Sequence, residues 1–183
     1  MQAEQVQLMR EKLAEYGDVQ LQAYAFLSLT TMGRVNAVAN LKWEQIDWEE
    51  RIFSGVLEKE AKIVEFSFSE ETKEYLEKMI EERKEKGIDD YGWVWHTPYT
   101  TTNRPVNNCT LGDWCKKIGN MIGVPTLHAH DFRHSYANLM KSEGVSLEDI
   151  STMLNHAGTD VTKKHYLLTD TSKVRKIKDS ISI

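Results

Sequence analysis

The apolar residues of this chain recur every three to four positions along most of its length, the period at which side chains share one face of an α-helix. Polar helix-start residues precede several of these segments and glycines follow them: Asp18, Ser69 and Ser146 are N-cap candidates, and Gly17, Gly87 and Gly144 are stop candidates. The pattern predicts helices over residues 3–16, 18–33, 70–87, 110–123, 128–143 and 146–154, with a short helix from residue 34 that runs into a loop. In the helix over 70–87, the apolar face is expected to consist of Tyr75, Leu76, Met79 and Ile80.

Residues 52–68 follow a different pattern. Their apolar residues lie in two runs on either side of LEKEAK: Phe53, Val56, Ile63, Val64, Phe66 and Phe68. Two short apolar runs around a polar turn predict a β-hairpin or small sheet. The region 89–108 holds two of the three prolines, which predicts a loop with one short strand. The expected fold class is therefore mainly α with a small antiparallel β-sheet (α+β).

Composition places the chain among ordinary globular proteins. Its 183 residues, 40% hydrophobic and 28% charged, suit a single domain with a buried core. No apolar run approaches the ~20 residues that a membrane-spanning helix needs, and the polar N-terminal stretch lacks a signal-peptide pattern. Cys109 and Cys115 have no metal-ligand spacing, which favours a reducing, cytoplasmic compartment. The net charge of −5 argues against nonspecific coating of nucleic acid but is compatible with a local basic cleft.

The stretch HAHDFRHSYANLM, residues 128–140, concentrates titratable and cationic side chains at the start of one predicted helix. His130, Arg133 and His134 share a face at the spacings i+3 and i+4. Zinc binding by the two histidines would call for a glutamate directly after the first, and Asp131 stands there instead. A neighbouring arginine would also repel a dication, so no metal and no cofactor are expected. Taken alone, the stretch also fits a solvated or structural helix face.

Other segments supply partners for this helix. Arg34 follows a glycine, Lys59 lies in the predicted hairpin, and LNHAGTDVTKKHY carries His156 and Tyr166. Attack on a phosphodiester adds negative charge to the phosphoryl oxygens, which fixed guanidinium and imidazole groups stabilise without a metal. A tyrosine hydroxyl, with an ordinary pKa of about 10, becomes a nucleophile beside cations and a proton acceptor. Together with Arg133, the set is chemically sufficient for metal-free transesterification.

The order of these residues resembles the tyrosine recombinases, or phage integrase family, from about residue 18 onward. GRVNAVANLKWEQID is similar to the first-arginine segment of the family, and HDFRHSYANLM to its histidine–arginine segment. LNHAGTDVTKKHY is similar to the histidine-to-tyrosine segment, and LEKEAK between two strand-like runs to the lysine hairpin. Each segment alone is only suggestive. Four of them in the family's order are a strong signal for a tyrosine recombinase catalytic domain.

The resemblance implies a role for each residue. Arg34, Arg133 and His156 would hold the nonbridging oxygens of the scissile phosphate. His130 would assist proton transfer at the attacking tyrosine. Lys59 would be the general acid that protonates the departing 5′ oxygen, and Lys62 would be its substitute. Because Lys59 lies among Glu58, Glu60 and Lys62, the alternative is a solvated hairpin tip without a role in catalysis.

The nucleophile implied by the resemblance is Tyr166. It would become joined to the 3′ phosphate and leave a free 5′ hydroxyl, so that a second strand can reseal the break without ATP. Two positions depart from the family pattern. Ala37 stands where an acidic residue usually supports the first arginine, which implies that another group holds Arg34. Asn155 replaces the usual glycine before His156.

The resemblance also implies partners and a domain arrangement. Residues 1–183 would form a single catalytic domain, a fragment that lacks the family's N-terminal DNA-clamping domain. Double-stranded DNA would be the partner, with a homo-tetramer assembled on it and accessory DNA-bending proteins among the further partners, but no membrane. The C-terminal tail, residues 167–183, would dock on a neighbouring subunit.

Two other functions stay open at this point. A type IB topoisomerase uses the same chemistry to relax supercoils without pairing two sites, and it usually has a lysine where this chain has His130. A degenerate, non-catalytic DNA-binding module would account for Ala37 and for the acidic net charge.

Overall fold

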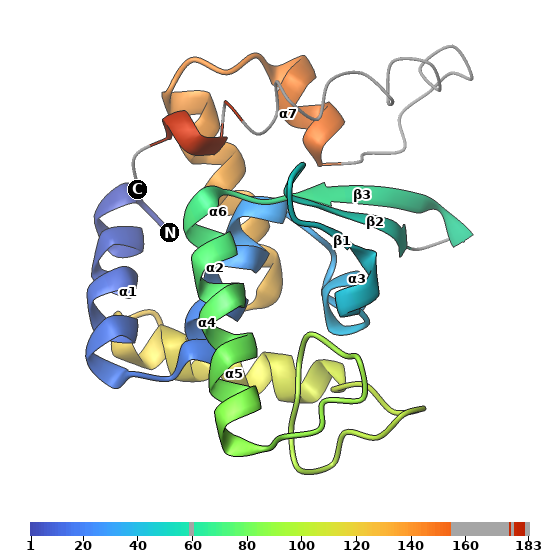
Figure 1. Cartoon of the computed structure of the whole chain (residues 1–183). Helices are drawn as coiled ribbons and strands as arrows, with labels where there is room; N and C mark the ends of the chain where they lie inside the picture. The colour runs from blue at the N-terminus through green and yellow to red at the C-terminus, as the bar shows by residue number, and fades with distance from the viewer. Residues whose placement is uncertain (59–60, 155–175, 177, 182–183) are drawn as a thin grey trace.

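The helices and strands expected from the sequence form with small shifts at their ends. The computed structural model describes residues 1–58, 61–154, 176 and 178–181 (Figure 1). In chain order the elements are α1 (Ala3–Tyr16), α2 (Val19–Thr31), α3 (Val35–Ala39), the 3-10 helix η1 (Trp43–Gln45), β1 (Ile46–Asp47), β2 (Ile52–Leu57), β3 (Ile63–Ser67), α4 (Glu70–Lys86), α5 (Asn108–Met121), α6 (Ala129–Ser142) and α7 (Leu147–Met153). The predicted fold class, mainly α with a small antiparallel sheet, is confirmed.

Helix α2 is the centre of the fold, where it packs against both α4 and α6 (Figure 1). It starts as predicted, because the side chain of Asp18 accepts a hydrogen bond from the backbone N–H of Leu21. The sequence predicted one apolar face, but the helix is buried on all sides, including the hydroxyls of Thr30 and Thr31. Each hydroxyl donates to the carbonyl four residues earlier, at 2.7 Å, and so remains paired inside the core.

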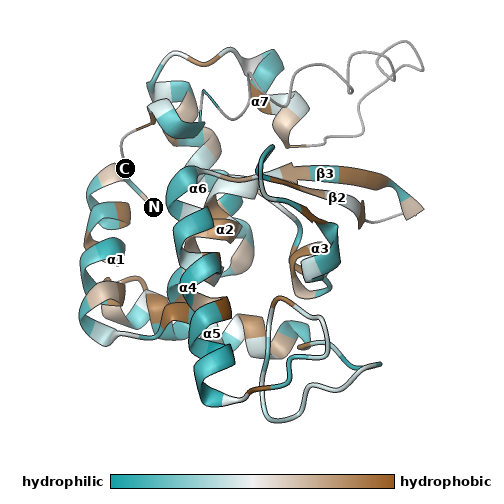
Figure 2. Cartoon of the chain, in the orientation of Figure 1, coloured by the Kyte–Doolittle hydropathy of each residue, from teal (hydrophilic) through white to brown (hydrophobic). Residues whose placement is uncertain are grey.

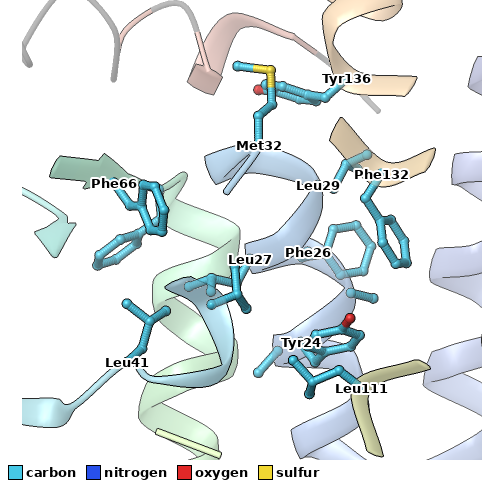
Figure 3. Close-up of a cluster of buried hydrophobic side chains, with 14 of the residues drawn as sticks. Tyr24, Phe26, Leu27, Leu29, Met32, Leu41, Phe66, Leu111, Phe132 and Tyr136 are labelled. Carbon is cyan, nitrogen blue, oxygen red and sulfur yellow. The ribbon is translucent and has the colours of Figure 1, made fainter. Parts of the chain in front are cut away.

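The core surrounds α2 and forms one cluster of buried side chains. Figure 3 shows the α2 side chains among residues contributed by α5, α6, β3 and the segment after α3. Tyr24 makes an edge contact with Phe132 of α6 at 6.2 Å between ring centroids, and Phe26 stacks on Tyr75 of α4 at 5.3 Å. These contacts join α2 to α4 and α6, so the helices form one packed body.

The three strands form an antiparallel sheet in the order β1-β2-β3. Phe53 pairs with Phe66 and Val56 with Val64, and these four side chains face the core. Between the two pairs the register shifts at an exposed Gly55, whose φ of 67° is the left-handed conformation that a β-bulge favours. The hairpin is as predicted, and the two-residue strand β1 adds an edge that the sequence pattern did not indicate.

Helix α4 confirms its predicted caps but not its whole apolar face. Its core-facing line consists of Thr72, Leu76, Met79 and Arg83. Ile80, expected on that face, is 37% exposed, so this prediction was wrong. Arg83 is buried because it pairs with Asp90 and donates to the backbone carbonyls of Trp93 and Val94. The rest of the helix is strongly hydrophilic (Figure 2).

The described part of the C-terminal tail packs on its own chain. Lys178 is 4% exposed and donates to the carbonyl of Ser67 at the end of β3. Asp179 accepts two hydrogen bonds from Arg51, at 2.9 and 2.6 Å. Residues 167–175, which belong to the predicted docking tail, lie outside the described residues. Within the described part of the chain, no helix has the length and apolar character needed to span a membrane.

Candidate active site

The first predicted site residue, Arg34, lies at the junction of α2 and α3. Met32 ends α2 with a φ of 51°, and Arg34 takes the extended conformation of an N-cap before α3. Gly33 lies between them against Phe66, where a Cβ would come within 2.8 Å of the ring. Only glycine fits this approach, so the tight junction fixes where the Arg34 side chain, 32% exposed, leaves the backbone.

The second predicted arginine, Arg133, lies on the inner face of α6 and is only 5% exposed. Its guanidinium donates to two backbone carbonyls, that of Met32 at the end of α2 and that of Leu154 after α7. Leu154 is the last described residue before the segment that carries His156. Arg133 therefore ties together two chain segments that each lead directly to another predicted site residue.

The structure brings Arg34 and Arg133 into one site. The pKa of Arg133 is lowered, first by burial and then by the positive charge of Arg34, while the negative charge of Glu58 raises it. A guanidinium keeps its proton in proteins, so both arginines carry a positive charge. The negative charge of Glu58 acts on Arg133 in the opposite sense to the charge of Arg34, so the carboxylate partly offsets the repulsion between the two guanidiniums.

Glu58 is a site residue that the sequence pattern did not single out. It follows β2, and its side chain is 0% exposed. Oε2 accepts a hydrogen bond from Nη1 of Arg34, whereas Oε1 has no hydrogen-bond partner among the described residues. The sequence suggested a solvated charge at the hairpin tip. Strand alternation was the available signal, because Val56 and Glu58 are two positions apart and both face inward.

His130 lies in the first turn of α6, one turn before Arg133, and is exposed. Its ring is 6.4 Å from that of His134, centroid to centroid. Asp131 serves as a helix cap, since its carboxylate accepts from the backbone N–H of His128 at 2.7 Å. Within residues 1–58 and 61–154 and the short C-terminal part described, no three histidine, cysteine or acidic side chains are grouped as metal ligands would be.

Three predicted site residues, Lys59, His156 and Tyr166, lie outside the described residues. The structure does describe the chain on both sides of Lys59. The backbone N–H of Glu58 donates to the carbonyl of Lys62 at 2.8 Å, so the described residues on the two sides of Lys59 are hydrogen-bonded to each other.

The arrangement has the charge and donors that suit a phosphodiester. Two guanidinium charges and one carboxylate leave a net positive charge at the site. Each guanidinium carries five N–H groups. Hydrogen bonds to the described residues use one N–H group of Arg34 and two N–H groups of Arg133. The other N–H groups of the two guanidiniums remain as donors for phosphoryl oxygens.

Several known proteins are similar to this chain. The tyrosine recombinase XerC of Lactobacillus delbrueckii subsp. bulgaricus is 26% identical over 149 residues, which cover 79% of this chain and 49% of XerC. The integrase of mycobacterium phage Brujita has a TM-score of 0.74 at 19% identity, over 97% of this chain and 56% of the integrase. The XerH site-specific recombinase, bound to a difH substrate in a pre-cleavage complex, has a TM-score of 0.70 at 17% identity, over 86% of this chain and 47% of XerH.

These matches differ in what they establish. The two solved structures share the fold of this chain. The chain spans half or less of the length of the curated relatives it matches. The sequence profile described as the phage integrase family matches residues 1–173, which is nearly the whole of the 183-residue chain. Together with the order of its predicted site residues, this match shows that the chain belongs to the phage integrase family.

Proposed function

We propose that the chain is the catalytic domain of a site-specific DNA recombinase that cuts and rejoins duplex DNA by metal-free transesterification. The observation that carries the proposal is the meeting of Arg34 and Arg133 in one net positive, partly buried site. Two arginines from distant parts of the sequence are brought together there although their charges repel each other, which is expected where an anion is to be held. The family match supplies the class of anion, the DNA phosphodiester.

The proposed role of the two arginines is to bind the nonbridging oxygens of the scissile phosphate. Attack turns the phosphorus five-coordinate and adds negative charge to those oxygens, so the fixed guanidiniums bind the transition state more tightly than the ground state. His156 completes this set in the proposal. Because Arg133 is held by two carbonyls, its position does not have to be organised during the reaction.

The proposed nucleophile is Tyr166, whose hydroxyl oxygen forms a bond to phosphorus as the bond from phosphorus to the 5′ oxygen breaks. The phenolic proton passes toward His130, and Lys59 gives a proton to the departing 5′ oxygen. A 3′-phosphotyrosine link and a free 5′ hydroxyl result. The link conserves the energy of the broken ester, so a 5′ hydroxyl from another strand reverses the step and reseals the DNA.

The proposed partners follow from the reaction. Duplex DNA is the substrate, and strand exchange between two sites calls for four copies of the chain, with accessory proteins bending the DNA. In the assembly residues 167–183 exchange between subunits, so that the contacts that Lys178 and Asp179 make to their own chain here are made to a neighbour instead. XerH in complex with its difH substrate is a neighbour in fold that supports the DNA partner. The cytoplasm is the proposed compartment.

Covalent capture tests the proposal. A pool of nicked duplexes with randomised sequence around the nick is incubated with the chain. Cleavage close to the nick releases a short fragment that carries the free 5′ hydroxyl, and loss of this fragment prevents resealing. Mass spectrometry then identifies the residue that carries a nucleotide adduct. We expect the adduct on Tyr166 and its complete loss in Tyr166→Phe. If neither protein traps DNA, alone or within a longer chain that includes a DNA-clamping domain, the non-catalytic binding module is correct.

A second measurement separates recombination from DNA relaxation. Duplexes captured in the first experiment are placed once or twice on a supercoiled plasmid. A recombinase exchanges strands between two copies and yields deleted or inverted products. A type IB topoisomerase relaxes plasmids with one copy or none, at the same rate, and gives no such products.

A further inference from the structure

Ala37 leaves the site without an acid on the helix that follows Arg34. It lies in α3, three residues after Arg34, and is 2% exposed. Its methyl group cannot accept a hydrogen bond, so it contributes nothing to the orientation of a guanidinium. A partly exposed arginine side chain without such a partner would sample many rotamers, and a phosphate would have to order it on binding.

The carboxylate of Glu58 reaches Arg34 from a different element, the end of β2. The Glu58 side chain has no exposed surface, whereas 32% of the Arg34 side chain is exposed. The carboxylate therefore lies on the protein side of the guanidinium, and the solvent-facing edge of Arg34 is left for a ligand. Burying a carboxylate away from water costs free energy unless the carboxylate is paired with a charge or a hydrogen-bond donor. The folded chain is therefore expected to keep Glu58 paired with Arg34.

From this geometry we propose that Glu58 is a positioning residue that replaces the acid missing at position 37 and holds Arg34 beside Arg133. The proposal rests on the proposed function. The backbone of Glu58 is itself held, because its N–H donates to the carbonyl of Lys62 at 2.8 Å. Its side chain therefore holds Arg34 from a fixed place at the end of β2.

The unpaired oxygen of Glu58 fits the same role. Oε1 has no donor among the described residues, so in this part of the chain no third group draws the carboxylate away from the two arginines. Its negative charge also acts on Arg133, as the upward contribution to the pKa of that residue indicates. One carboxylate therefore serves two guanidiniums that would otherwise repel each other.

Single-turnover cleavage tests the proposal on duplexes that the unaltered chain captures. Glu58→Gln keeps the shape of the side chain and removes its charge. We expect its cleavage rate to fall ~10- to 100-fold, the effect of a misplaced reacting group. The Kd for the same duplexes should change little, because most of the affinity comes from other phosphate contacts. Glu65→Gln is the matched control, since Glu65 is an exposed acid on the same hairpin, and its rate should not change.

Second-site rescue distinguishes positioning from a general structural role. Glu58→Ala removes the carboxylate and leaves space beside Arg34. Adding Ala37→Glu to that variant returns an acid from α3, and we expect the cleavage rate to recover in part. A rate unchanged in Glu58→Gln would overturn the proposal. A faster rate would overturn it too, since the carboxylate would then be competing with the phosphate for Arg34.

A double-mutant cycle of stability measurements tests the contact between Arg34 and Glu58 independently of activity. Thermal unfolding is measured for the unaltered chain, Arg34→Gln, Glu58→Gln and the double variant. If the unaltered chain traps no DNA, the proposed function fails, whereas the cycle still reports whether Glu58 holds Arg34. Additive changes, with no coupling between the two positions, would overturn the inference by itself.

Discussion

The guanidinium of Arg133 donates a hydrogen bond to the backbone carbonyl of Met32, the residue that ends α2 two positions before Arg34. One proposed phosphate ligand thus fixes the chain that presents the other. The same guanidinium holds the carbonyl of Leu154, at the start of the segment leading to His156. Arg133 is for this reason a structural centre of the site as well as a proposed ligand.

Arg133→Lys should therefore lose stability as well as activity. A lysine ammonium is a point charge on a different stem and cannot hold two carbonyls in the planar arrangement of a guanidinium. Losing one buried, charge-assisted hydrogen bond costs about 1.5–3 kcal/mol, which urea unfolding would measure. Arg104→Lys, at an exposed position, is the control and should unfold at the same urea concentration as the unaltered chain. Equal stability of both variants would contradict this role.

Gly33→Ala should be destabilising although it adds one methyl group. The new Cβ would lie 2.8 Å from the Phe66 ring and 2.9 Å from a methyl carbon of Val38, so the strand or α3 must shift. Overpacking of this kind costs about 1–3 kcal/mol. Gly112→Ala is the matched control, because its Cβ meets no atom within 4 Å in the interior of α5, and helix propensity should raise stability by about 0.5–1 kcal/mol. Thermal unfolding of the two variants should give shifts of opposite sign.

Docking of the C-terminal segment should strengthen as pH rises above neutrality. Burial lowers the pKa of Lys178 to about 7 in the folded chain, from 10.5 when exposed. Between these values the unfolded chain binds more protons, so stability rises with pH, by at most about 1.4 kcal/mol per unit. Below pH 7 the lysine is charged in both states, and the full penalty of burying the charge remains.

The measurement is urea unfolding between pH 6 and pH 10, compared with Lys178→Met. The methionine keeps an unbranched stem without a titrating group, so the rise of stability between about pH 7 and 10 should be smaller in the variant. Parallel curves for the two proteins would show that Lys178 does not carry the pH dependence.

Tyr136→Phe should leave the chain as stable as before or more stable. The hydroxyl of Tyr136 is buried in α6 and has no hydrogen-bond partner among the described residues, and burial raises the pKa of this group. Removing an unsatisfied hydroxyl removes a desolvation penalty of about 1–3 kcal/mol. Calorimetry would detect the gain as a higher Tm. Tyr24→Phe provides the contrast, because the Tyr24 hydroxyl contacts the sulfur of Cys115 at 3.3 Å and would lose a partner.

The helices, the strands and the family could be predicted from the amino-acid sequence, because the signals for them are local. Caps such as Asp18 and Ser69 act within three residues of their position, as their bonds to Leu21 and Thr72 show. Apolar spacing identified α4, α5 and α6, and the arginine and histidine segments were recognisable from their own letters. The order of the candidate residues needed no knowledge of the fold.

Which charged side chains are buried in the interior depends on tertiary contacts that the sequence pattern did not reveal. Spacing suggested an apolar face that included Ile80, but the core accepts Arg83 instead, because Asp90 and two loop carbonyls pair with it. Glu58 appeared to be one more solvated acid in LEKEAK, yet it is buried against Arg34, a residue 24 positions earlier. Burial of a charge depends on a partner that folding brings from elsewhere in the chain, and a sequence pattern confined to one segment contains no record of that partner.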